Sequence, residues 1–190
     1  MARDPERIER LQAGLKEAGL DAIVCALPSN VLLLTGYYPM TGRSIAVATR
    51  DGELLLLVPE DEKELAESNA DLVIILRSST LGEVHRHLVD HFHLNGKIVG
   101  CECGACCQPA SYVSMHFYGD AICKALEGAH VRRADEFLKR MKAVLTPIEL
   151  DRICRACRIA GRPLWLKVTK LRPPVPGLEG GASFELGARC

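Results

Sequence analysis

The sequence has no apolar run long enough to span a membrane. Its first residues are charged and amphipathic, and they lack the apolar segment of a signal peptide. These two absences argue against a membrane protein and against an exported one. We therefore expect a cytoplasmic protein with no membrane partner, in which the nine cysteines are reduced thiols by default.

Motifs of common catalytic sites are also missing. The chain has no Gly-x-Ser-x-Gly segment, which would place a nucleophilic serine on a sharp turn. Gly177–Gly181 is rich in glycine but lacks the lysine of a phosphate-binding loop. Acidic residues are scattered over polar faces, and no pair of them lies in an apolar setting. The sequence therefore predicts no catalytic residue in this chain.

An excess of positive charge is absent as well. The 24 basic side chains balance the 24 acidic ones, and residues 162–190 carry five basic and two acidic side chains. The preceding residues are therefore mildly acidic as a group. This distribution argues against a nucleic-acid partner.

What the chain does contain is an alternation of strand and helix patterns. Short apolar runs predict strands, and apolar residues spaced three and four apart predict helices. We expect strands at residues 21–25, 44–49, 53–58, 71–76, 97–101 and 130–133, and helices at residues 5–18, 60–68, 80–94, 109–126, 135–142 and 146–160. Asp51-Gly52 between two of the strands indicates a hairpin. The pattern predicts a three-layer α/β fold, with a mixed β-sheet flanked by helices.

The pattern changes after Gly161. Thr146, Pro147 and Glu149 form a well-defined helix start, and the helix that they predict reaches Ala160. The remaining residues hold four prolines and four glycines, without a sustained apolar period. We therefore expect linker helices over residues 135–161 and an irregular, disordered tail over residues 162–190.

Cysteines and histidines are the first candidates for a metal site. Two residues separate Cys103 from Cys106, and the same spacing recurs at Cys154 and Cys157, as in zinc-binding pairs. The two pairs are far apart in sequence, and the second lies on the apolar face of a predicted helix, where cysteine acts as a small hydrophobe. A four-cysteine zinc site and a redox pair are alternatives, and cysteines without a metal are the favoured interpretation.

His87 and His91 are four residues apart on one predicted helix, so both could reach one metal ion. No glutamate lies between them in the metalloprotease arrangement. An exposed histidine face is therefore the favoured interpretation.

The loop from Leu34 to Arg43 is the remaining candidate. Tyr37, Tyr38 and Arg43 lie on a turn flanked by glycines, which is a plausible contact surface. The alternative is an ordinary loop whose tyrosines pack on the sheet.

Several segments, taken in order, resemble one known family. Residues 7–24 resemble the opening of the creatinase/prolidase/aminopeptidase P family. Asn30–Gly36 resembles its Asn-x-x-tyrosine-leucine-threonine-glycine signature, with Leu33 in place of the usual aromatic residue. The similarity continues through residues 51–59, the Gly-x-Glu strand end at residues 100–102, and residues 138–150. It covers residues 5–161, and its N-terminal domain part is residues 5–134.

The resemblance implies a non-catalytic N-terminal domain. In that family the catalytic "pita-bread" domain follows and holds two divalent metal ions, typically manganese, cobalt or zinc, with two Asp, one His and two Glu. Residues 162–190 contain neither Asp nor His, so we expect no cofactor and no metal ligand in this chain. The resemblance also implies a homodimer, or association with an intact homologue, in which loop residues reach the neighbouring active site. Tyr37, Tyr38 and Arg43 are the positions that would contact substrate there.

The resulting hypothesis is a truncated or frameshifted N-terminal domain of an Xaa-Pro aminopeptidase or creatinase-like hydrolase, inactive by itself. The alternatives are an Xaa-Pro peptidase and a zinc-binding module that uses Cys103, Cys106, Cys154 and Cys157. The cysteines of the resembling segments, such as Cys101, would then fill apolar positions.

Overall fold

The computed structural model describes residues 4–40, 44–77, 80–102 and 120–171. The chain divides into two compact units, Met1–Val144 and Leu145–Cys190. Among the described residues, no helix combines the length and the apolar character needed to cross a membrane.

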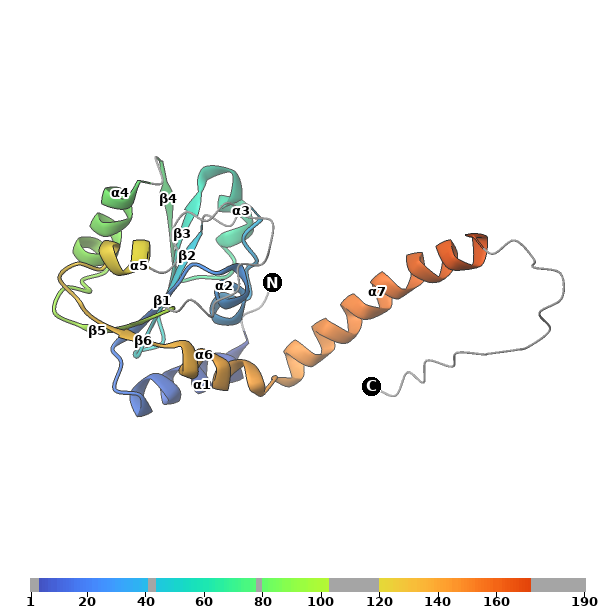
Figure 1. The fold of residues 1–190 in the computed structure, drawn as a ribbon, viewed down its shortest axis with the longest axis horizontal. Coiled ribbons are helices and arrows are strands. Elements are labelled where there is room, and N and C mark those ends of the chain that lie inside the picture. Colours follow the sequence, from blue (N-terminus) through green and yellow to red (C-terminus); the bar gives the residue numbers. More distant parts are fainter. Residues whose placement is uncertain (1–3, 41–43, 78–79, 103–119, 172–190) are drawn as a thin grey trace. The chain divides into compact units, whose positions relative to one another are not determined.

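The described part of the first unit is built on a six-stranded sheet with the order β4-β3-β2-β1-β5-β6 (Figure 1). Its strands are β1 Ala22–Cys25, β2 Ile45–Thr49, β3 Leu54–Pro59, β4 Leu72–Leu76, β5 Ile98–Cys101 and β6 His130–Arg133. β2 is antiparallel to both of its neighbours, β1 and β3. The other pairs are parallel, which confirms the predicted mixed sheet.

Helices cover both faces of this sheet, which confirms the three-layer fold (Figure 1). One face packs against α1 Pro5–Glu17, α2 Pro28–Thr35, α3 Lys63–Ala66 and α6 Asp135–Ala143, and a short 3-10 turn, η1 Glu60–Glu62, precedes α3. The other face packs against α4 Leu81–His85, the π-helical segment η2 Arg86–His91 and α5 Asp120–Ala125. Alternate residues of each central strand point to opposite faces, so that Ile23 joins one core and Val24 the other.

The hairpin between β2 and β3 confirms the Asp51-Gly52 prediction. Gly52 has a φ of 94°, a conformation that favours glycine. A Cβ atom at this position would also collide with the side chain of Gln12, so the turn packs closely against α1.

Four segments differ from the sequence prediction. Residues 28–35, whose type the sequence left open, form α2, because Pro28 at the first helical position starts a helix. The apolar run at residues 71–76 forms β4 at the sheet edge rather than inside the sheet, and Leu72 is 39% exposed. The helix that begins at Thr80 changes from α to π after His85, and this extra residue per turn lets both Leu88 and Val89 face the core.

The fourth difference is the length of the last helix, α7 Pro147–Leu171. The irregular tail predicted from residue 162 is therefore wrong for residues 162–171, and residues 172–190 lie outside the described part. Thr146 and Glu149 form the predicted capping box, with hydrogen bonds of 3.2 Å and 2.8 Å. Once a helix is nucleated, each added residue gains a hydrogen bond, so a glycine at residue 161 weakens it without ending it. The predicted helix at residues 109–126 is described only from Asp120, as α5.

Candidate functional site

The carboxylate of Glu102 joins the end of β5 to the start of α2. Its Oε1 atom accepts the backbone N–H groups of Ala26 and Leu27, and its Oε2 atom accepts the side-chain amide of Asn30. The N-cap residue of α2, Leu27, has no side chain that could cap the helix. Glu102 therefore acts as the cap from 75 residues away, and it also offers a negative charge to the positive end of the helix.

This junction is buried, which sets its electrostatics. Glu102 is 1% exposed and Asn30 is 2% exposed. Burial raises the pKa of the Glu102 carboxyl group above its usual range, and its three hydrogen bonds, together with the charge of Lys142, oppose this shift. The Oδ1 atom of Asn30 has no hydrogen-bond partner in the described part of the chain. The sequence analysis identified Glu102 only through a family resemblance, and it assigned Asn30 to no helix.

The other end of α2 leads into the loop that carries the predicted contact residues. Gly36 ends the helix with a φ of 75°, and its N–H donates to Leu32 O at 2.8 Å. Tyr37 then turns inward and is 4% exposed. Its hydroxyl lies 3.3 Å from Ser44 Oγ, which donates to the buried carboxylate of Glu62 at 3.4 Å. Tyr37 thus fastens the loop to the core.

The next residues of the loop reach the surface. Tyr38 is 48% exposed and Met40 is 69% exposed, while Arg43 lies outside the described residues. Of the three predicted contact residues, Tyr37 is therefore buried and Tyr38 is exposed to solvent. A role for Tyr38 in contacting substrate or a partner stays a prediction.

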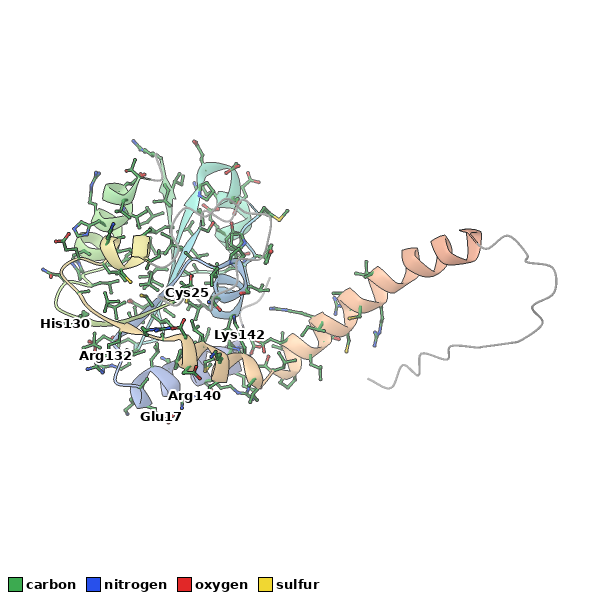
Figure 2. All side chains as sticks on the ribbon, in the orientation of Figure 1. Glu17, Cys25, His130, Arg132, Arg140 and Lys142 are labelled. Carbon is green, nitrogen blue, oxygen red and sulfur yellow. The ribbon has the colours of Figure 1, made fainter. Side chains whose placement is uncertain are left out.

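Two arginines of α1 hold the end of α6, a feature that the sequence analysis missed. Arg7 is 3% exposed, and its guanidinium donates to Met141 O at 2.8 Å and to Val144 O at 3.1 Å. Arg10 also donates to Val144 O, at 3.2 Å. Carbonyl groups at the end of a helix have no partner within it, so these cations stabilise the C-terminus of α6. Glu17 on α1 and Arg140 on α6 also form an ion pair, with 3.9 Å between Oε1 and Nη1 (Figure 2).

The cysteine and histidine candidates do not form a metal site among the described residues. Within that part of the chain, no group of three or more His, Cys, Asp or Glu residues could hold a metal ion. Cys154 and Cys157 lie on α7 and are not part of a disulfide, whereas Cys103, Cys106 and the side chain of His91 lie outside the described part. The four-cysteine zinc site therefore stays an untested alternative.

One cysteine departs from the expectation of reduced thiols. Cys101 is buried and disulfide-bonded, whereas Cys25, Cys123, Cys154 and Cys157 are not part of a disulfide. Cys123 lies close to it, with 3.6 Å between the two Sγ atoms. Cys101 thus carries a bond that its apolar position in β5 did not indicate.

Solved structures share this arrangement of sheet and helices. An X-Pro aminopeptidase from Thermotoga maritima aligns with a TM-score of 0.62 and 20% identity, over 87% of this chain and 44% of that one. A proline dipeptidase from Streptococcus pneumoniae aligns with a TM-score of 0.54 and 20% identity, over 76% of this chain and 100% of that one. At these identities the similarity establishes the fold.

Sequence comparison adds the family. An Xaa-Pro dipeptidase from Pyrococcus furiosus is 25% identical over 185 residues, which are 97% of this chain and 46% of that protein. The chain thus spans about half the length of the curated relative that it matches. Residues 7–144, which include the Glu102 junction and the Tyr38 loop, match the family described as Creatinase/Prolidase N-terminal domain. The chain therefore belongs to the creatinase/prolidase N-terminal domain family.

Proposed function

We propose that this chain is a non-catalytic N-terminal domain of an Xaa-Pro peptidase lineage and that it serves assembly and substrate access. The observation that carries this proposal is the family match over residues 7–144, combined with alignment to about half of an Xaa-Pro dipeptidase. The metal-dependent hydrolysis of such relatives would then depend on their other half.

The solved chain from Streptococcus pneumoniae supports treating this domain as a unit. That chain aligns over its whole length with 76% of the present one. The described sheet also has two cores of its own, one on each face. A domain with its own hydrophobic cores can fold without a catalytic half attached.

Hydrolysis is the first test. The purified chain is incubated with an Xaa-Pro dipeptide and added Mn²⁺ or Co²⁺, and release of proline is followed over time. We expect no turnover above the rate of the metal alone. Metal-dependent turnover by a homogeneous preparation would contradict the proposal and favour the peptidase alternative. Zinc that stays bound in stoichiometric amount through dialysis would instead favour the cysteine module.

Assembly is the second test. We propose self-association, or association with an intact homologue, through the surface that includes Tyr38. The side chain of Tyr38 is exposed, and the neighbouring Tyr37 anchors the same loop to the core. Light scattering of the chain as it elutes from a size-exclusion column should give the mass of a dimer. Tyr38→Ala should weaken this association. Leu65→Ala is a matched control, since Leu65 is exposed to a similar degree, at 58%, on α3. A monomer at all concentrations that also fails to bind a full-length homologue would contradict this role.

A further inference from the structure

The two edge strands of the described sheet differ in charge. β4 and β6 are the end members of the strand order, so each has a neighbouring strand on one side only (Figure 1). The sequence of β6 is His-Val-Arg-Arg, and its exposed Arg132 and Arg133 carry positive charge along that edge. The sequence of β4 is Leu-Val-Ile-Ile-Leu, with neither a charged residue nor a proline. Charge and proline prevent pairing at a sheet edge, so β4 lacks a protection that β6 has.

The backbone of β4 offers hydrogen-bonding groups on its outer side. Leu54 of β3 faces β4, because its N–H donates to Asp71 Oδ2 at 2.7 Å and its carbonyl accepts the N–H of Asp71 at 2.6 Å. In the parallel register of β3 and β4, Leu72 and every second residue after it then bond to β3. The N–H and C=O groups of Val73 and Ile75 therefore point away from the sheet.

The strand and its flanking residues are complementary to themselves. The apolar run is nearly the same in both directions from its central residue, Ile74. Asp71 precedes the run and Arg77 follows it, each at three positions from Ile74, and both are exposed. When two copies of β4 lie antiparallel about Ile74, Asp71 of each copy is opposite Arg77 of the other. A two-fold axis repeats every such contact, so the two charge pairs form together.

We propose that β4 pairs antiparallel with β4 of a second copy of this chain, centred on Ile74, so that the two sheets become one. Val73 of each copy then exchanges two backbone hydrogen bonds with Ile75 of the other. Asp71 and Arg77 form an ion pair at each end of the paired strands. A shift of the register by two residues would place one of these charges opposite an apolar side chain, so the ion pairs set the register.

The pairing is weak, and it is separate from the association proposed for Tyr38. β4 has five residues, and a contact of that length is smaller than a stable interface. We therefore expect it at high protein concentration. The carboxylate of Asp71 already accepts the N–H of Leu54, and the pairing uses its charge rather than an unoccupied oxygen. The tests are made in the Tyr38→Ala chain, so that failure of one surface does not decide the other.

Sedimentation velocity over a series of concentrations, up to the millimolar range, tests the pairing. The Tyr38→Ala chain should pass from monomer to dimer. Arg77→Glu places acidic side chains opposite each other, and Asp71→Lys places basic ones opposite each other. Each variant alone should need at least about tenfold higher concentration to associate. An equimolar mixture of the two should associate like the chain without these changes, because every acidic side chain then faces a basic one.

The opposite edge supplies the matched control. Arg132→Glu makes the same change of charge on β6, and it should leave the association unaltered. A monomer at every concentration, a mixture that associates no better than its components, or equal effects of Arg77→Glu and Arg132→Glu would overturn the proposal. Particles larger than a dimer would also contradict it, because pairing of β4 with itself closes after two copies.

Amide hydrogen exchange gives a second measurement, which does not depend on the folding of Asp71→Lys. Circular dichroism checks that folding. In the Tyr38→Ala chain, the N–H groups of Val73 and Ile75 should exchange at least about threefold more slowly at the highest concentration than at the lowest. The N–H groups of β6 should keep their rates. Unchanged exchange at Val73 and Ile75, in a sample that has become dimeric, would place the contact elsewhere and overturn the proposal.

Discussion

The helices α1 and α7 begin with the same chemistry, yet their apolar faces have opposite environments. α1 begins with an Asp4 cap and Pro5, and α7 begins with a Thr146 cap and Pro147. On α1, Leu15 is fully buried. On α7, Leu150 is 51% exposed and Ile153 is 46% exposed.

The difference shows that local signals determine where a helix begins but not what it packs against. A cap and a proline act within one helical turn, through hydrogen bonds and a fixed φ. Burial requires a second surface, and α1 finds it on one face of the sheet. α2 adds a third case, because its cap comes from a residue distant in the sequence, Glu102.

Leu15→Ala should have the largest effect, because it opens a cavity in the core beneath α1. We expect the free energy of unfolding to fall by about 3 kcal/mol. Urea denaturation followed by circular dichroism measures it. A loss below about 1 kcal/mol would mean that α1 is no better packed than the exposed part of α7. The two helices would then not differ in the way described here.

Glu102→Ala tests the distant cap and should cost about 2 kcal/mol, because the N–H groups of Ala26 and Leu27 lose their acceptor while buried. Glu102→Gln is the matched control. Its amide oxygen can still accept both N–H groups, and its NH₂ group can donate to Asn30 Oδ1 if that amide rotates. We expect the glutamine variant to be at least as stable as the unaltered chain at neutral pH. Equal losses in both variants would show that the charge itself is needed.

The pH dependence of stability, compared between the unaltered chain and Glu102→Gln, tests the role of the charge directly. The folded state raises the pKa of Glu102 above its usual value of 4.5, so the folded chain holds this proton more tightly than the unfolded chain. The contribution of Glu102 to stability is therefore complete below that value and is lost as pH rises through the higher folded pKa. Denaturation at several pH values should show the unaltered chain losing stability relative to Glu102→Gln. The opposite trend would mean that the hydrogen bonds outweigh the burial.

Ile153→Ala should have the smallest effect. Its side chain is already 46% exposed, so we expect the free energy of unfolding to change by no more than about 0.5 kcal/mol. The same denaturation experiment measures it beside Leu15→Ala. A loss as large as that of Leu15→Ala would indicate that this face of α7 is buried in solution, for example in an assembly.

Several features of the fold could be predicted because their signals are local. Asp51-Gly52 specified a hairpin, and Thr146 with Glu149 specified the start of α7. Gly161 led to a wrong helix end, because one glycine weakens a helix that the hydrogen bonds of all its other residues stabilise. The total over the whole helix cannot be judged from one position.

The candidate site was less predictable. Tyr37 and Tyr38 are adjacent and chemically identical, and the path of the loop alone decides that one is buried while the other is exposed. The hydrogen bonds of Glu102 and Arg7 join residues that are distant in the chain. No local pattern reports such partners.

The sequence by itself determined the helix starts, the hairpin and the alternation of strands and helices that gives a three-layer fold, because capping, turn geometry and apolar period act over a few residues. Only the tertiary structure decided that Glu102 caps α2, that Arg7 binds the end of α6 and that Cys101 and Cys123 meet. Glu102 reaches α2 because the parallel strands β1 and β5 end at the same edge of the sheet, and the other two contacts depend on how helices pack on the sheet. Hydrogen bonds and sulfur contacts depend on distances between atoms, and the folded chain sets those distances.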